Sequence, residues 1–273
     1  MSTHLFLSAK YGFLEMVSLF PFFIFFVSFS SYLFTAFPSI YWRDASEFQA
    51  IGYLLDIAHP AGSPLYAIIA KGITFIPIGS IAFKITLVSS IFGAMLSVLF
   101  YYIVLSILRI LFQKMREDTS LNWIGLITTI FFSFSNAVWE NSNRAEVYTF
   151  QNFFTAIFIL TLLNFPPFIS ATSNLYQRSF RFFFSIAFLY GLSLGAHAII
   201  VLYLPFLFFW LYFSWLKPKG AWVSYKTIKY LFLLFFFFII GFSVYLYLPI
   251  RSSQNPHYDW GNPETFENFI YHT

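Results

Sequence analysis

The fold is decided by stretches such as FKITLVSSIFGAMLSVLFYYIVLSIL, residues 83–108, in which Lys84 is the only charged side chain. A membrane-spanning α-helix needs about 20 mostly apolar residues. The pattern recurs and predicts seven spans, at residues 16–38, 83–108, 122–139, 148–168, 182–196, 198–216 and 228–250. The fifth span is short and shares a bend with the sixth at residues 195–197, so this pair also fits one broken hairpin.

Composition supports a membrane protein. Of the 273 residues 59% are hydrophobic and only 10% are charged, and 42 are Phe, whereas soluble domains carry about 25% charged residues. The absence of Cys excludes disulfides, a thiolate zinc site and a cysteine nucleophile. We therefore expect residues 1–273 to form a single all-α, polytopic transmembrane bundle. The net charge of +4 does not require a nucleic-acid partner, and we expect none.

The distribution of basic residues predicts the orientation of the spans. With the N-terminus in the cytoplasm, ten of the 15 Lys and Arg residues and three of the 11 acidic residues lie on the inner side. Seven crossings place the tail, residues 251–273, outside. The unusual polar stretches then all fall on the outer face, at residues 43–47, 59–60, 136–148, 197 and 251–273. Their convergence predicts a site on that face.

The first outer loop, residues 41–81, is too long for a simple turn and predicts two helices. Asp44 suits an N-cap, and Glu47 completes a pattern like a capping box. Apolar residues follow at helical spacing, at Phe48, Ile51, Leu55 and Ala58. His59-Pro60 should end this helix, because the residue before Pro avoids the α conformation.

The second helix of this loop is predicted to begin at Ser63-Pro64 and to end near Ile76-Pro77. Amphipathic helices of less than spanning length lie in the membrane interface. Asp44 and Glu47 therefore have two readings. They cap a helix, or they are catalytic carboxylates at a boundary of low polarity, where the pKa of an acid rises towards that of a useful base.

Five short motifs together resemble a known family of multi-pass membrane proteins. They are RDASEF at residues 43–48, IAHPAGSPLY at 57–66, NRAEVY at 143–148, GLSLGAH at 191–197 and YLPIRSSQNPHYDWGNP at 247–263. In this order they resemble the transmembrane protein 260 family, also called domain of unknown function 2723, which is a protein O-mannosyltransferase type of GT-C glycosyltransferase. Ala45 and Ser46 are permuted relative to the family pattern. Family members usually continue beyond the last motif, so we expect the outer tail to be truncated.

The resemblance implies a GT-C-like fold and transfer of a sugar, such as mannose, from a polyprenyl-phosphate donor. The acceptor would be a hydroxyl group, such as that of a protein Ser or Thr, on the outer or lumenal face. The resemblance makes Asp44 the base and Glu47 its assistant. Substrate-binding candidates are His59, Arg144, Glu146, His197, Arg251 and Trp260. Arg and His suit the leaving phosphate, since charge-assisted hydrogen bonds to phosphate are strong.

Each candidate also has a simpler explanation. Arg144 and Glu146 would solvate a tight loop, and His197 would be a satisfied histidine at a helix break. Trp260 would stack on a sugar ring or anchor the tail at the interface, where Trp is enriched. The sequence contains no P-loop, no G-x-G-x-x-G and no metal-ligand spacing. We therefore expect no metal, and the sequence identifies no cofactor.

Two other functions compete with the enzyme. A transporter or flippase of lipid-linked sugars would use the same polar residues for binding, but it should carry paired ionisable groups near mid-membrane, which are almost lacking here. A non-catalytic fragment or partner subunit is the third reading. The expected partners are membrane lipids, a lipid-linked donor and a protein acceptor. The bacterial inner membrane is the preferred location, with a periplasmic active face, and the endoplasmic reticulum remains an alternative.

Overall fold

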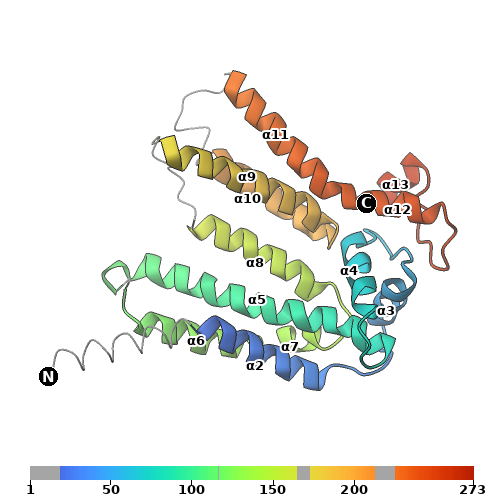
Figure 1. Ribbon diagram of the computed structural model, residues 1–273, viewed down its shortest axis with the longest axis horizontal. Coiled ribbons are helices and arrows are strands. Elements are labelled where there is room, and N and C mark those ends of the chain that lie inside the picture. Colours follow the sequence, from blue (N-terminus) through green and yellow to red (C-terminus); the bar gives the residue numbers. More distant parts are fainter. Residues whose placement is uncertain (1–18, 116, 165–172, 213–224) are drawn as a thin grey trace.

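The computed structural model describes residues 19–115, 117–164, 173–212 and 225–273 (Figure 1). These parts are helical, with one isolated parallel bridge between Ile57 and Asp259. In chain order the α-helices are α2 Phe20–Thr35, α3 Asp44–Leu54, α4 Pro64–Thr74, α5 Ile81–Leu111, α6 Ser120–Ser133, α7 Asn136–Ser142, α8 Tyr148–Asn164, α9 Ser173–Leu194, α10 Leu204–Leu211, α11 Tyr225–Phe242, α12 Tyr247–Ser252 and α13 Phe266–His272. Short 3₁₀ segments are η1 Gln113–Met115, η2 Ala198–Tyr203 and η5 Ser243–Leu246. The expected all-α class is confirmed for the described residues.

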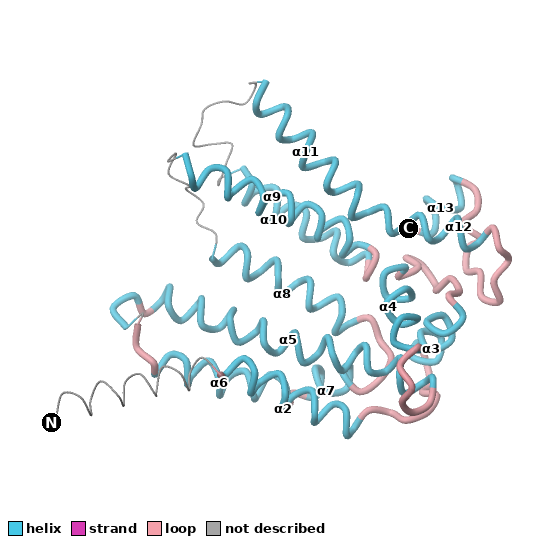
Figure 2. The backbone as a smooth tube through the Cα atoms, in the orientation of Figure 1, coloured by secondary structure: helices cyan, strands magenta, loops and turns pink. Residues whose placement is uncertain are grey.

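The long helices run side by side, and the short helices α3, α4, α12 and α13 gather at one end of them (Figures 1 and 2). Helix α5 packs against α2, α6 and α8, while α9 packs against α11. Gly191 and Gly241 allow the second pair to approach closely, since a Cβ atom on either would collide with a backbone carbonyl of the facing helix. Small residues at such contacts are typical of membrane helix pairs.

Two stretches of described helix are long and apolar enough to cross a membrane, Ile81–Leu111 and Ile228–Ser252. A third would be the bent pair α6 and α7. The helices Phe20–Thr35, Phe182–Leu194 and Ala198–Phe209 are apolar but shorter. Parts of three predicted spans, residues 16–18, 165–168 and 213–216, lie outside the described residues. So do four of the basic residues assigned to the inner side, at positions 10, 116, 217 and 219. The prediction of seven crossings therefore stays a prediction.

The predicted span at residues 122–139 is not one straight helix, because α6 and α7 meet at a bend of 62°. Ser135 has an extended backbone there, with φ −63° and ψ 146°. Its hydroxyl donates to the carbonyl of Phe132 at 2.7 Å, and the hydroxyl of Ser133 donates to that of Thr129 at 2.8 Å. Serine side chains that bond to backbone carbonyls in this way compete with the helix and bend it.

The predicted bend between the fifth and sixth spans is confirmed. Helix α9 ends at Leu194 and η2 begins at Ala198. Pro205 lies in the first turn of α10, where its missing N–H costs no helix hydrogen bond. It therefore lies where the 3₁₀ segment η2 passes directly into the α-helix α10.

The first outer loop contains two helices, as expected, but the details of α3 differ. Asp44 is its first residue and Arg43 occupies the N-cap position, with a φ of 62° and no side-chain cap. The predicted capping role of Asp44 is therefore wrong. Helix α3 also ends at Leu54, so Leu55, at φ 58°, and Ala58 lie beyond it. The reason is that distant side chains bind the last carbonyls of α3, as described below. Helix α4 begins at Pro64 as predicted.

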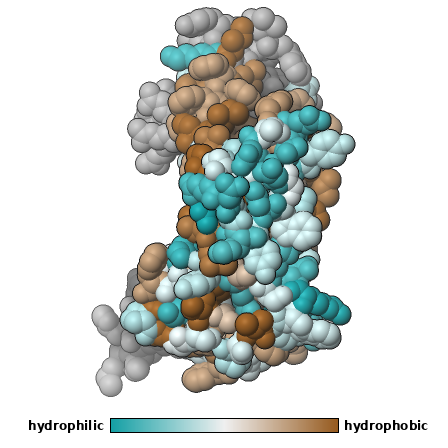
Figure 3. All heavy atoms as spheres, turned by 90° about the vertical axis from the view of Figure 1, so that its right-hand side faces the viewer, coloured by the Kyte–Doolittle hydropathy of each residue, from teal (hydrophilic) through white to brown (hydrophobic). Residues whose placement is uncertain are grey.

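The end of the bundle that carries α3, α4 and α12 is the polar end of the molecule. Figure 3 views this end directly and shows hydrophilic side chains gathered across its middle, with hydrophobic side chains around them. The motifs at residues 43–48, 57–66, 143–148, 191–197 and 247–263 meet here. Segments far apart in sequence thus build one surface.

Candidate active site

A small polar pocket lies at this end, between α3, the turn before α4, the segment before α8 and the turn after α9. It encloses about 30 Å³, which is room for one or two water molecules. Only the reacting end of a substrate fits inside, so the remainder would lie at the mouth. The lining residues are Asp44, Phe48, His59, Pro60, Ala61, Ser63, Glu146, Val147, Tyr148, His197 and Ala198. The pocket thus brings together four of the candidates named above, from four separate segments.

Glu47 lies behind His59 and holds it in place. Its Oε1 accepts a hydrogen bond from the backbone N–H of His59 at 2.7 Å, and its Oε2 lies 2.9 Å from Nδ1 of the same residue. A carboxylate beside Nδ1 favours a proton on that nitrogen, which leaves Nε2 for the pocket. Glu47 therefore orients His59 and does not cap α3.

Asp44 is the exposed carboxylate of the pocket. It stands at the first position of α3. Within the described residues no hydrogen bond is formed by its carboxylate. A free carboxylate in a pocket is able to take a proton from a hydroxyl group brought within reach.

Glu146 is the buried carboxylic acid of the pocket. Its backbone is fixed by Ser89, whose hydroxyl accepts from the N–H of Glu146 at 3.0 Å and donates to its carbonyl at 2.9 Å. Burial raises the pKa of Glu146 to about 7; Arg144 and His59 act in the opposite direction, whereas Asp44 adds to the rise. Such a pKa suits a group that exchanges a proton near neutral pH.

Arg144 is shared between two acids. Its Nη1 donates to Glu140 at 2.9 Å, whereas its Nε lies 3.8 Å from Oε1 of Glu146. The second guanidinium nitrogen, Nη2, donates to Asn141 at 3.1 Å. The Nε of Arg144 and Oε2 of Glu146 are both buried without a hydrogen-bond partner in the described part of the chain. The charge of Glu146 is therefore only weakly compensated.

His197 lines the opposite wall of the pocket. Its Nδ1 accepts a hydrogen bond from the backbone N–H of Ile199 at 3.1 Å, and its ring lies 6.2 Å from that of Tyr148. Burial, together with the neighbouring His59, lowers the pKa of His197. Its neutral ring therefore carries the proton on Nε2, which is the tautomer that can donate a hydrogen bond.

Arg251 does not reach the pocket. Its Nε donates to the carbonyl of Leu55 at 2.8 Å, its Nη2 to that of Leu54 at 3.3 Å, and its Nη1 to Gln254 at 2.7 Å. Its Nη2 also lies 3.6 Å from Oδ1 of the buried Asp56. Arginine can satisfy the last carbonyls of a helix in this way, so the position of Arg251 explains why α3 ends at Leu54.

Sequence reasoning missed the cluster to which Arg251 belongs. We call Asp56, Tyr247, Arg251 and Tyr258 the clamp. The hydroxyl of Tyr247 donates to the carbonyl of Asp56 at 3.0 Å, and Oδ2 of Asp56 accepts from the backbone N–H of Tyr258 at 3.2 Å. The feature of the sequence that could have indicated the clamp is Asp56, a lone acid in an apolar stretch. The clamp fixes the segment that leads to His59.

Three further residues complete the description of this end. Ser63, also missed, lines the pocket and donates to the carbonyl of Ala196 at 3.0 Å. Trp260 is 51% exposed and does not line the pocket. His272 is buried, and within the described residues both of its ring nitrogens lack a hydrogen bond. Among the same residues, no three His, Asp or Glu side chains are placed to hold a metal ion.

An all-helical bundle with spanning apolar helices, and with an acid–histidine pocket at one end, defines a membrane protein with an enzyme-like site. Residues 44–220 match the family described as Protein O-mannosyl-transferase TMEM260 N-terminal domain, and the chain belongs to this family.

Two curated relatives are similar over most of this chain. Protein O-mannosyl-transferase TMEM260 of Mus musculus is 29% identical over 231 residues, which are 84% of this chain and 30% of the relative. Protein O-mannosyl-transferase tmem260 of Dictyostelium discoideum is 29% identical over 250 residues, 88% of this chain and 28% of the relative. The chain thus spans less than a third of the length of either relative. No solved structure matches it.

Proposed function

We propose that this chain carries the acceptor-activating site of an integral-membrane glycosyltransferase. The enzyme transfers a sugar from a polyprenyl-phosphate donor to a hydroxyl group of a protein Ser or Thr. Mannose is the sugar that we propose to test first. The family and the names of the two relatives support the reaction type. The observation that carries the proposal is the carboxylate of Asp44, which forms no hydrogen bond with the described residues and lines a pocket with His59 and Glu146 at the polar end of an apolar bundle.

The proposed reaction is a displacement at the anomeric carbon of the sugar. The acceptor oxygen forms the new bond to this carbon, and the bond from the carbon to the phosphate oxygen breaks. Asp44 takes the proton of the acceptor hydroxyl, and the polyprenyl phosphate leaves with the bonding electron pair. His59, held by Glu47, and His197 offer ring nitrogens to the sugar or to the phosphate. Positioned hydrogen-bond donors of this kind stabilise developing charge.

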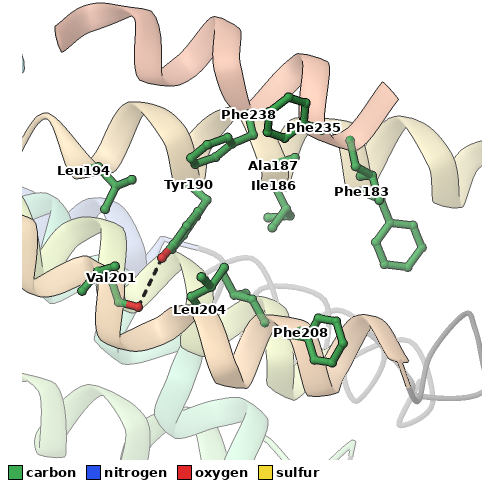
Figure 4. A pocket seen from close by; sticks show the side chains of 12 residues that line it. Phe183, Ile186, Ala187, Tyr190, Leu194, Val201, Leu204, Phe208, Phe235 and Phe238 are labelled. Atoms are coloured by element: carbon green, nitrogen blue, oxygen red, sulfur yellow. Dashed lines mark hydrogen bonds between the residues drawn. The ribbon is translucent and has the colours of Figure 1, made fainter. Parts of the chain in front are cut away.

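An apolar cavity next to the pocket supports a lipid-linked donor. It lies between α9, α10 and α11 and holds about 390 Å³ (Figure 4). The described residues that line it are apolar or aromatic, and the hydroxyl of Tyr190 donates to the carbonyl of Val201 at 3.3 Å. Leu194 and Val201 line this cavity, and His197, between them in sequence, lines the polar pocket. We propose that the polyprenyl tail lies in the cavity while its phosphate reaches the pocket.

The test of the proposed reaction compares the native chain with Asp44→Asn in membranes supplied with labelled polyprenyl-phosphate mannose and an acceptor peptide. Loss of a positioned acid or base costs about 10² to 10⁴-fold in rate, so we expect transfer to fall at least a hundredfold. Asp118→Asn is the matched control, because Asp118 is exposed in the loop between α5 and α6. Equal transfer by native chain and Asp44→Asn would remove Asp44 from the mechanism.

The membrane arrangement is part of the same proposal. We place the N-terminus in the cytoplasm, seven crossings in the bilayer and the pocket on the periplasmic face of a bacterial inner membrane. The charge distribution supports this orientation. The chain has no Cys, so single cysteines can be introduced without background. A membrane-impermeant maleimide added from outside should label Gln254→Cys and not Asp118→Cys. The reverse labelling would invert the topology.

A further inference from the structure

Glu146 differs from Asp44, the other acid that lines the pocket, in having almost no contact with water. It is 4% exposed, and its Oε2 has no hydrogen-bond partner among the described residues. A buried acid that is neither paired closely nor hydrogen-bonded is costly when ionised. A protonated carboxyl group avoids this cost and gains an O–H donor.

The surroundings of Glu146 do not supply a full counter-charge. The titratable groups that face it from the neighbouring segments are Asp44, His59, Tyr66, Glu140 and Arg144. Arg144 is the nearest cation, but its contact with Glu146 is 3.8 Å long and Glu140 takes the shorter bond of 2.9 Å. Asp44 adds a second negative charge to the same pocket. Two ionised acids here would also repel a phosphate.

We propose that Glu146 binds the lipid-linked donor in its protonated form, and that its O–H donates a hydrogen bond to a phosphate oxygen of that donor. The inference rests on the proposed function, and it names the residue that receives the phosphate. It also assigns different roles to the two acids, since Asp44 takes a proton while Glu146 gives a hydrogen bond. Two neighbouring carboxyl groups in different environments commonly divide the roles of a reaction between them.

Two features of the surroundings of Glu146 agree with a ligand at this point, although Tyr66 and Arg144 do not themselves line the pocket. The hydroxyl of Tyr66 is buried and lacks a hydrogen-bond partner among the described residues, as do Oε2 of Glu146 and Nε of Arg144. It is unusual in a folded protein for three neighbouring residues each to have a buried polar atom without a hydrogen bond. The apolar cavity is lined by Leu194 and Val201, and His197, between them in sequence, lines the pocket together with Glu146. A donor with its tail in the cavity would therefore extend its phosphate towards the pocket.

The direct test is infrared spectroscopy of the full chain in nanodiscs. The C=O stretching band of a protonated carboxylic acid is separate from the bands of carboxylates. At pH 6 we expect such a band in the native chain and in Glu264→Gln, an exposed control outside the pocket, and its loss in Glu146→Gln. A band that Glu146→Gln leaves unchanged would overturn the inference. This measurement needs no donor and no transfer activity.

The second test measures binding of a polyprenyl phosphate methyl ester. This diester keeps one charge, whereas a phosphate monoester titrates with a second pKa of about 6. If only the protonated form of Glu146 binds, and its pKa is about 7, the native affinity should fall about tenfold between pH 6 and pH 8. Glu146→Gln, which keeps an N–H donor and cannot ionise, should bind at pH 8 as the native chain does at pH 6. Glu264→Gln should behave as the native chain.

The outcomes of the binding test separate the two proposals. If Glu146→Gln binds the diester more than tenfold more weakly than the native chain at pH 6, the neutral role of Glu146 is overturned while the lipid-phosphate donor stands. If the native chain binds the diester no better than the matching polyprenol, the phosphate contact is overturned together with the proposed donor. A pH-independent Glu146→Gln with preserved affinity supports both.

Discussion

Two arginine–acid pairs lie at the same end of the bundle and are built differently. In the clamp all three guanidinium nitrogens of Arg251 donate hydrogen bonds. Oδ2 of its partner Asp56 accepts from the backbone of Tyr258, while Oδ1 has no hydrogen bond among the described residues. In the pocket Arg144 bonds more closely to Glu140 than to Glu146, and its Nε is left without a hydrogen bond among the described residues.

The difference separates structure from function. Each pair leaves one buried carboxylate oxygen without a hydrogen bond among the described residues, so the difference lies in the arginines. Arg251 uses all three of its nitrogens to hold the segment before His59, whereas Arg144 leaves Nε unbonded beside an acid with a perturbed pKa. Buried polar groups almost always find partners, and groups with perturbed pKa values cluster at functional sites. The comparison predicts that changes in the clamp act mainly on stability and changes in the pocket act mainly on pH dependence.

The largest effect is expected from breaking the clamp. Asp56→Ala removes a fully buried acid and leaves Arg251 and the N–H of Tyr258 without it. Removing one member of a buried ion pair costs about 3 to 5 kcal/mol, and we expect the lower figure because Arg251 is 27% exposed. Thermal unfolding in detergent measures the loss, with exposed Glu264→Ala as the control. An unchanged unfolding midpoint would make the clamp an incidental contact.

The pocket should show its effect as a pH dependence of stability. The folded pKa of Glu146 is raised from 4.5 to about 7, so between these values the folded chain binds more protons than the unfolded chain. Stability from this group is therefore present below pH 4.5 and is lost as pH rises to about 7. The raised pKa corresponds to a loss of up to about 3 kcal/mol.

Glu146→Gln tests this sign. The variant cannot ionise at this position, so its unfolding free energy should decline less than that of the native chain as pH is raised through this window. Denaturant titrations at several pH values measure the difference. If the unfolding free energies of the two proteins change in parallel with pH, the pKa of Glu146 is not perturbed. The contrast between the pocket and the clamp would then be wrong.

Sequence reasoning reached the helical class and the main pocket residues for identifiable reasons. Apolar runs define helices locally, and polar motifs next to them predict where a site is formed. Asp44, His59, Glu146 and His197 were found in this way. Glu47 was named, but its partner His59 is 12 residues away and belongs to a different segment, so its positioning role required the fold.

Arg251 shows why the remainder could not be predicted. A cation at the end of a span suits a phosphate as well as it suits a helix carbonyl. Whether Arg251 binds a phosphate or a helix carbonyl is decided by its hydrogen bond to Leu55, 196 residues away in sequence. The end of α3 has the same cause, since the periodicity of apolar residues continues to Ala58 while the carbonyls of Leu54 and Leu55 are held by Arg251. The broken span between α6 and α7 likewise depended on local serine bonds that an apolar window does not detect.

The smallest and most discriminating effect is expected from Glu140→Gln. Glu140 is half exposed and pairs with Arg144 four residues later, so its removal should change stability by only about 0.5 kcal/mol. Glu140 also raises the pKa of Glu146, and its loss frees Arg144 to turn towards that acid. Both effects favour the ionised form, so the Glu146-dependent change of stability should move to lower pH. A shift to higher pH would show that Arg144 does not compensate the charge of Glu146. The Arg144–Glu146 pair would then differ from the Arg251–Asp56 pair in its electrostatics as well as in its hydrogen bonds.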